Sequence, residues 1–137
     1  LLLKNRLASY LSKFSLAVLL VSVVSCVKES DLNDNRELWI GSWTCSEIEG
    51  DFAPQTYPVE IVERVILTEV GIKGLYNQGL SFTVIAEVSG DNLVIPTQVV
   101  DDIQIAGSGS LNDEEITLYF DADDGSFADE VKAILIR

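Results

Sequence analysis

Carboxylates and two cysteines are the side chains most able to carry chemistry in this 137-residue chain, because it contains no histidine. A Ser-His-Asp triad, a Cys-His pair and a His-ligated zinc site are therefore excluded. Gly107-Ser108-Gly109-Ser110 is no phosphate-binding loop, since the lysine and the helix that such loops require do not follow it. We predict that the protein is not an enzyme, with no catalytic residue and no cofactor.

The carboxylates form two clusters in the last third of the chain. Asp113-Glu114-Glu115 is typical of a solvated turn, and a denser cluster runs from Asp121 to Glu130. Calcium takes about six to eight oxygen ligands from a flexible loop. The denser cluster departs from the EF-hand order, because Gly125 stands where the third ligand would be. We favour an acidic, solvated loop over a calcium site and assign no metal ligand.

Cys26 ends an apolar run that begins near Phe14 and follows three basic residues. A basic segment, a short apolar run and a small residue before the cut define a secretory signal. The run is shorter than the roughly 20 residues of a membrane-spanning helix. Its end, Val23-Val24-Ser25-Cys26, resembles the lipobox of bacterial lipoproteins, which implies cleavage before Cys26 and acylation of that residue. The alternatives are an ordinary cleaved signal and an uncleaved helix.

The lipobox resemblance divides the chain into a signal peptide (1–25), a flexible acidic tether (26–37) and a folded domain (38–137). The tether is polar and charged, a composition that disfavours folding. Its segment Lys28-Glu29-Ser30-Asp31 is similar to the signal that sends Bacteroidetes lipoproteins to the outer face of the outer membrane. The resemblance therefore implies a lipid-anchored protein of the bacterial cell envelope, at the outer membrane, with the leaflet left open.

The net charge limits the classes of binding partner, and the cysteine count indicates the role of Cys45. The formal net charge is −13, and removing residues 1–25 takes away three basic and no acidic residues, which leaves −16. Such an acidic body repels phosphate backbones, so we predict no nucleic-acid partner and attachment to the membrane through the lipid on Cys26. Cys45 is then unpaired, and we predict a small buried residue on a strand.

From residue 38 onward, short apolar runs alternate with turn residues every 8 to 12 positions, as in all-β sandwiches and barrels. Short connections favour antiparallel pairing of neighbours. Pro96 indicates a bulge or an edge, and Gly107 and Gly109, on the inward side, indicate close packing or a sharp bend of the sheet. The pattern predicts an eight-stranded antiparallel meander that closes into a small up-and-down barrel, with strands at about 40–48, 57–65, 69–76, 80–89, 93–99, 103–111, 116–122 and 131–136.

Gly41-Ser42-Trp43 on the first strand and Arg137 at the end of the last resemble the calycin superfamily of lipocalin-like barrels. The segments Leu93–Gln98 and Ile105–Gly109 are also similar to calycin-like lipoproteins of Bacteroidetes. The resemblance implies that Trp43 lies at the closed end of a calycin-like barrel, beneath Arg137, as a structural pair. Arginine over indole contributes about 0.5–2 kcal/mol, depending on burial.

These observations favour a non-enzymatic envelope lipoprotein whose barrel binds a small apolar ligand or an envelope protein, neither identified by the sequence. The alternative is a structural or protein-interaction module at the cell surface, with a barrel filled by its own side chains and no small-molecule ligand. An eight-stranded barrel is compatible with both. We expect a filled interior, because the predicted inward residues are bulky (Trp43, Phe82, Ile95, Leu118 and Phe120).

Overall fold

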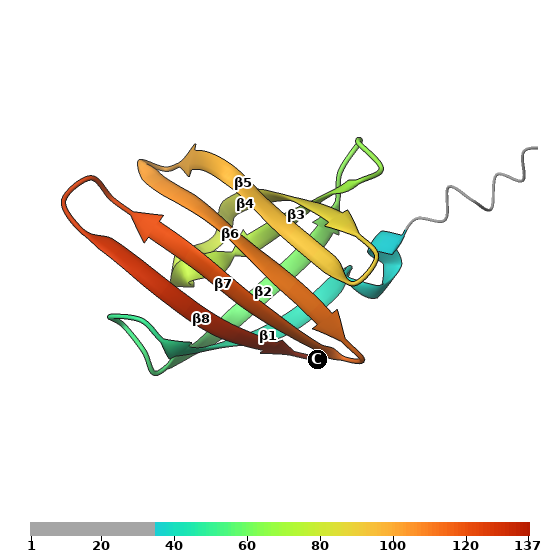
Figure 1. The fold of residues 1–137 in the computed structure, drawn as a ribbon, viewed down its shortest axis with the longest axis horizontal. Coiled ribbons are helices and arrows are strands. Elements are labelled where there is room, and N and C mark those ends of the chain that lie inside the picture. Colours follow the sequence, from blue (N-terminus) through green and yellow to red (C-terminus); the bar gives the residue numbers. More distant parts are fainter. Residues whose placement is uncertain (1–34) are drawn as a thin grey trace, which may run out of the picture. The chain divides into compact units, whose positions relative to one another are not determined.

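The computed structural model describes residues 35–137, which form an all-β closed barrel of eight antiparallel strands (Figure 1). Each strand pairs with its neighbours in sequence, and β1 also pairs with β8. The predicted meander is therefore confirmed. The predicted signal peptide, Cys26 and most of the tether lie outside the described residues. The strands are β1 (Gly41–Glu49), β2 (Gln55–Glu63), β3 (Glu69–Gly74), β4 (Gly79–Ser89), β5 (Asn92–Val100), β6 (Ile103–Asn112), β7 (Glu115–Asp123) and β8 (Ala128–Ile136).

Alternation of inward and outward side chains explains why these segments form strands around one core. On β4 the inward side chains are Phe82, Val84, Ala86 and Val88, all of them buried. Every strand contributes to the same hydrophobic cluster. Cys45, the described cysteine, is free and fully buried in that cluster, as predicted.

The glycines of β6 allow close approach between β6 and β7. A Cβ atom on Gly107 would lie 2.3 Å from the Tyr119 carbonyl oxygen, and one on Gly109 would lie 2.4 Å from the Leu118 side chain. The contact at Gly107 is with backbone and excludes any side chain there, whereas a side chain at Gly109 would require the Leu118 side chain to move. The close packing predicted from the sequence is therefore present.

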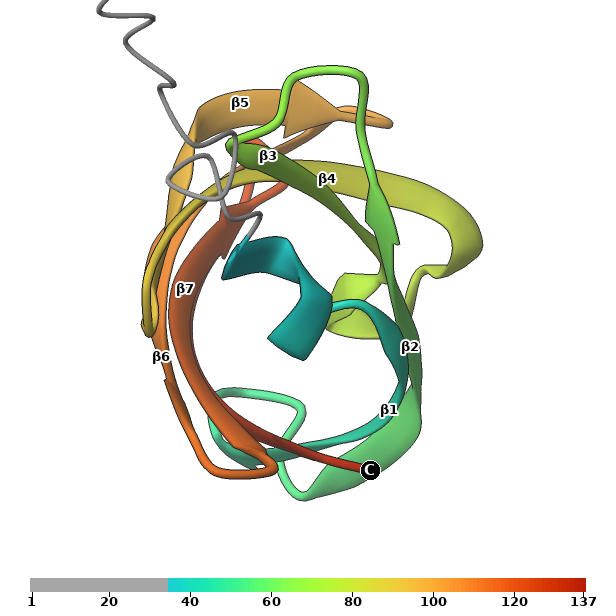
Figure 2. The ribbon, with the colours of Figure 1, turned by 90° about the vertical axis from the view of Figure 1, so that its right-hand side faces the viewer.

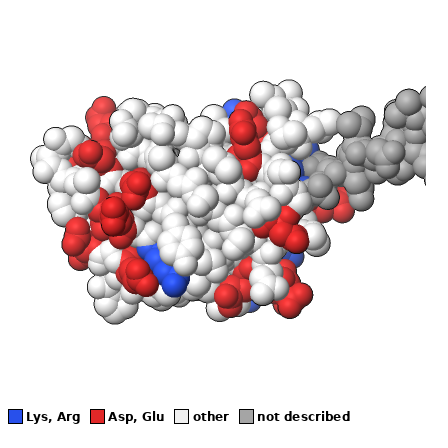
Figure 3. Space-filling model, in the orientation of Figure 1, with Lys and Arg blue, Asp and Glu red and all other residues white. Residues whose placement is uncertain are grey.

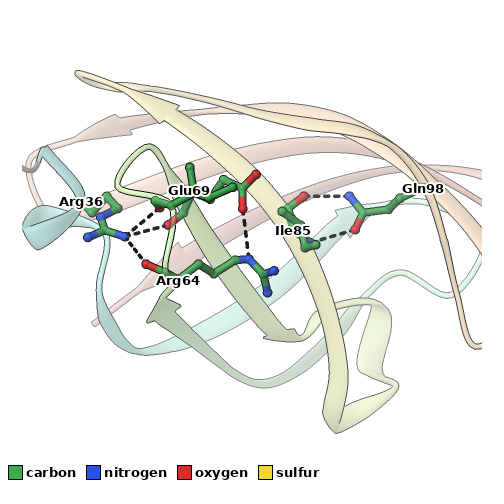
Figure 4. Close-up of polar contacts among 6 residues, drawn as sticks. Arg36, Arg64, Glu69, Ile85 and Gln98 are labelled. Atoms are coloured by element: carbon green, nitrogen blue, oxygen red, sulfur yellow. Dashed lines mark hydrogen bonds and ion pairs between the residues drawn. The ribbon is translucent and has the colours of Figure 1, made fainter.

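The pairing between β4 and β5 is short. These strands share three paired positions next to their turn. Farther along β5, its register against β6 shifts between Ile95 and Gln98, around Pro96. Beyond the bulge, the Gln98 amide accepts from the Ile85 nitrogen at 2.8 Å and donates to the Ile85 oxygen at 2.7 Å (Figure 4). A side-chain amide thus replaces the missing strand pairing.

The two ends of the barrel are built differently. We call one the closed end: it holds the 3-10 turn η2 (Asn35–Leu38), the β2–β3 loop and residue 137. Figure 2 looks onto this end and shows η2 lying across the barrel opening. The predicted tether ran to residue 37, yet Arg36 is buried and hydrogen-bonded to the β2–β3 loop, so residues 35–37 belong to the folded domain.

The opposite end, which we call the mouth, holds the β1–β2, β5–β6 and β7–β8 connections and the 3-10 turn η3 (Leu75–Asn77) between β3 and β4 (Figure 1). The last connection is shorter than predicted, because β8 begins at Ala128 and not near residue 131. Asp129 therefore belongs to a strand. It shares its parity with the buried Val131, Ala133 and Leu135, and so points inward.

Candidate binding site at the barrel mouth

Trp43 and Arg137, the two residues singled out by the sequence, are in contact at the closed end. The Arg137 guanidinium carbon lies 4.4 Å from the centroid of the Trp43 ring. The same guanidinium donates to the carbonyl oxygens of Leu38 at 2.7 Å and Ile40 at 3.0 Å. Pairing of β8 with β1 brings residue 137 to this place. The pair closes this end of the barrel.

Trp39 completes this closure. Its side chain is fully buried, and its indole N–H donates to the Gly90 carbonyl oxygen at 3.1 Å. The Trp43 indole N–H donates in turn to the Trp39 carbonyl oxygen at 2.9 Å. Both indoles thus pack against the core with their polar atoms satisfied, as buried indoles require.

At the mouth, the chain instead buries a carboxylate. Glu47 follows Trp43 and Cys45 on the inward face of β1 and is 1% exposed. Its Oε1 accepts from the Tyr57 hydroxyl at 2.6 Å, and its Oε2 accepts from the Gln55 side-chain amide at 2.7 Å. A buried carboxylate without partners is costly. Here both oxygens are satisfied by neutral donors.

A second set of hydrogen bonds connects this carboxylate to the mouth loops. The Tyr76 nitrogen donates to the Tyr57 hydroxyl at 2.9 Å, and the Tyr76 hydroxyl donates to Asp129 Oδ2 at 3.0 Å. The Asp51 nitrogen donates to Asp129 Oδ1 at 2.9 Å. Tyr76 has a φ of 59°, in the left-handed region that is unfavourable for a bulky side chain. The bonds to Tyr57 and Asp129 offset that strain.

Aromatic rings form the rim above this network. Phe52 lies edge-on to both Tyr76 and Phe127, with ring centroids 5.8 Å and 6.1 Å apart. Tyr76 also meets the inward Phe120, at 6.1 Å. Between the rim residues is a hollow of about 250 Å³ that opens to solvent, lined by Phe52, Tyr76, Gln78, Ile103, Ala122, Asp124 and Phe127.

Burial changes the acid–base properties of the groups beneath the rim. It raises the pKa of the Cys45 thiol to about 12, and the neighbouring Glu47 charge adds to the effect. Burial also raises the pKa of Tyr57 far above its usual range, with further contributions from Cys45 and Glu47. The pKa of Tyr76 rises through burial and its bond to Asp129. All three groups are therefore neutral at physiological pH, and Cys45 is a buried, protonated thiol.

The acidic segment from Asp121 to Glu130 is divided by the structure. Asp124 Oδ1 accepts from the backbone nitrogens of Ser126 and Phe127, at 3.0 Å and 2.9 Å, and these bonds lower the Asp124 pKa. Asp129, by contrast, faces the interior. Within residues 35–137, no three His, Cys, Asp or Glu side chains are grouped so as to hold a metal ion. The segment forms a turn through its own hydrogen bonds.

Other hollows lie outside the barrel. One of them, of about 420 Å³, is an open groove across β6, β7 and β8 that includes Tyr119, Asp121 and Lys132. The Lys132 ammonium lies 5.4 Å from the Tyr119 ring centroid and 3.8 Å from Glu49 Oε1. On the face seen in Figure 3, charged side chains gather toward the two ends, and the surface between them is mostly uncharged. The mouth hollow differs from this groove in having buried polar groups beneath it.

The residues beneath the mouth were not identified as a site from the sequence. Glu47, Tyr57, Tyr76 and Asp129 come from four separate elements, and only barrel closure brings them together. The available signal was parity. Glu47 alternates with Trp43 and Cys45, which the strand pattern had already placed inward.

No protein-family model matches the sequence, and no curated protein matches it.

Within residues 35–137, no helix is both long and apolar enough to cross a membrane.

Proposed function

We propose that this protein is a lipid-anchored envelope protein whose small barrel binds a ligand at its mouth. The observation that carries the proposal is the mouth hollow of about 250 Å³, bordered by half-exposed aromatic rings above a buried, fully hydrogen-bonded network. Ligand sites commonly combine an apolar lining with a few well-placed polar groups. The lipobox at Val23–Cys26 supports the anchor, and the Trp43–Arg137 contact supports a calycin-like barrel.

The charges on the mouth connections and the volume of the hollow narrow the class of ligand. The four mouth connections contain Asp51, Asp101, Asp102 and Asp124 and no lysine or arginine. An anionic ligand would meet uncompensated negative charge there. The hollow is also smaller than the roughly 300–1,000 Å³ of drug-sized ligand pockets. We therefore propose a small ligand, neutral or cationic, with an apolar part that contacts Phe52 and Phe127.

Native mass spectrometry of the full chain, extracted from its host membrane in detergent, tests this proposal. We expect a co-purifying small molecule, and we expect Phe52→Ala to weaken its binding on the order of tenfold, which is about 1.4 kcal/mol. Tyr119→Ala is the matched control, because Tyr119 is 52% exposed on the outer wall and Phe52 is 56% exposed at the mouth. Equal loss in both variants, or no ligand at all, would contradict a mouth site.

Intact mass measurement of the same sample tests the anchor. We expect a chain that begins at Cys26 and carries the added mass of several acyl groups. We expect the membrane fraction to contain no processed chain of the Cys26→Ala variant. An unmodified Cys26 in a processed chain would rule out lipid anchoring while leaving the mouth site open.

A structural or protein-interaction module is the second candidate function. The barrel interior favours it, because buried hydrophobic side chains from every strand fill it. An envelope protein that co-purifies in the absence of a small molecule, and is lost in Phe52→Ala, would establish this alternative.

A further inference from the structure

We propose that the β2–β3 loop at the closed end rests on the lipid bilayer that carries the Cys26 anchor. Val65, Ile66 and Leu67 stand in succession at the tip of this loop and are 98%, 57% and 58% exposed. Three adjacent aliphatic side chains in water are unfavourable for an isolated domain, and such exposed patches mark interaction sites. This inference rests on the proposed lipidation of Cys26.

The loop is held in its exposed conformation by a buried arginine. Arg36 Nη1 donates to the carbonyl oxygens of Arg64 at 2.8 Å, Ile66 at 3.2 Å and Glu69 at 3.1 Å (Figure 4). The Glu69 nitrogen also donates to the Ile66 oxygen at 3.0 Å. With its carbonyls turned onto Arg36, the loop directs the side chains at its tip away from the core. The exposed tip is therefore a fixed feature of the fold.

The tether places this end of the barrel near the membrane. Asn35, at the start of η2, stands nine positions after Cys26. Even a fully extended chain of that length spans only about 30 Å, at about 3.5 Å per residue. Arg36 connects η2 directly to the β2–β3 loop. The lipid anchor and the apolar tip are therefore joined through one short segment, and the mouth lies at the opposite end of the barrel.

The chemistry of the tip fits a bilayer better than a protein surface. Protein-binding hot spots are enriched in Trp, Tyr and Arg, whereas this tip carries only Val, Ile and Leu. Arg64, the cation next to the tip in the sequence, is paired with Glu69, with Nε 3.2 Å from Oε2. Its charge is thus partly compensated when the loop approaches lipid. Glu63 is exposed at the base of the loop and limits the contact to the tip.

A depth measurement on the full lipoprotein tests this contact. Ile66→Cys and, as the control, Phe52→Cys are labelled with an environment-sensitive fluorophore and reconstituted in phosphatidylcholine vesicles that contain a spin-labelled lipid quencher. The two positions are matched, at 57% and 56% exposure, and buried Cys45 does not compete for the label. We expect the Ile66 probe to shift to the blue and to be quenched several-fold more than the Phe52 probe.

The outcomes separate this inference from the proposed function. If mass spectrometry shows acylated Cys26 and the Ile66 probe reports water, the bilayer contact is refuted while the lipid anchor stands. If Cys26 is not acylated, the anchor itself fails. Combining Val65→Ser with Leu67→Ser on the Ile66→Cys background should abolish the extra quenching, and quenching that persists would show that these side chains do not make the contact.

Discussion

The two ends of this barrel satisfy their polar groups with different donors and acceptors. At the closed end, Arg36 and Arg137 donate to backbone carbonyls, and two indoles fill the space beneath them. At the mouth, Tyr57 and Tyr76 donate to the carboxylates of Glu47 and Asp129. One end uses cations and backbone oxygens, and the other uses neutral phenols and buried acids. Barrel closure therefore does not dictate which polar groups complete each end.

The same difference suggests that the two ends contribute differently to stability and to ligand binding. At the closed end the Arg137 guanidinium covers the Trp43 ring, which is 3% exposed. The mouth keeps a hollow and half-exposed rings. In the part of the chain described, every buried side-chain nitrogen and oxygen has a hydrogen-bond partner at both ends. We therefore expect the closed end to dominate the stability of the barrel and the mouth to dominate its response to pH and ligands.

The largest effect should come from Trp39→Ala. Trp39 is fully buried at the closed end, and large-to-small substitutions of buried aromatic residues cost about 3–5 kcal/mol. Urea denaturation followed by circular dichroism measures the loss. Trp39→Phe keeps most of the ring but removes the N–H that bonds to Gly90, so it should cost less. A loss below about 1 kcal/mol for Trp39→Ala, the scale of a single hydrogen bond, would contradict the stabilising role of this end.

Alkaline pH should act on the mouth first. Because burial raises the Cys45 pKa from 9.0 to about 12, the folded state holds a proton that the unfolded state releases. This contribution is complete below pH 9 and is lost as pH rises through 12, by at most about 4 kcal/mol at 1.36 kcal/mol per unit. Tyr57, whose pKa is also raised, acts in the same direction above pH 10. Unfolding free energies measured across this range test the trend.

Cys45→Ala is the control for the alkaline limb. Its unfolding free energy should stay level up to about pH 10, where Tyr57 begins to contribute. Both tryptophans of the chain lie at the closed end, so their fluorescence reports that end alone. A tryptophan signal that changes at lower pH than tyrosinate absorbance would show that the closed end, and not the mouth, is the weaker in alkali.

Glu47→Ala should have a smaller effect, again at the mouth. It removes the acceptor for the Tyr57 hydroxyl and the Gln55 amide, and a buried donor left without a partner costs about 1–3 kcal/mol. Glu49→Ala on the same strand is the control, because Glu49 is exposed and paired only with Lys132 at 3.8 Å. Surface pairs contribute about 0–1 kcal/mol. Equal losses in thermal denaturation would show that burial of Glu47 does not matter.

The sequence predicted the strands well because their signal is local. Inward and outward side chains alternate on β4, and turn residues separate each strand from the next. The bulge at Pro96 and the close packing at Gly107 and Gly109 were also predicted, since each follows from the chemistry of one residue type.

The mouth could not be predicted in the same way, because its contacts join distant positions. Tyr76 bonds to Asp129 across 53 positions. The left-handed conformation of Tyr76, which directs its nitrogen toward Tyr57, leaves no mark in the sequence. Asp129 was assigned to a solvated loop because acidic residues usually face water. In the structure, Asp129 lies at an inward position of β8 and accepts hydrogen bonds from Tyr76 and Asp51, which explains its burial.

Gln98 has a consequence for how this protein behaves at high concentration. Its amide occupies the N–H and C=O of Ile85, where β4 and β5 have separated. Without it, those groups would form an open strand edge, and such edges recruit strands from other molecules. Gln98→Ala should therefore lower solubility more than it lowers stability. We therefore expect the Gln98 side chain to limit aggregation by occupying the backbone groups of Ile85.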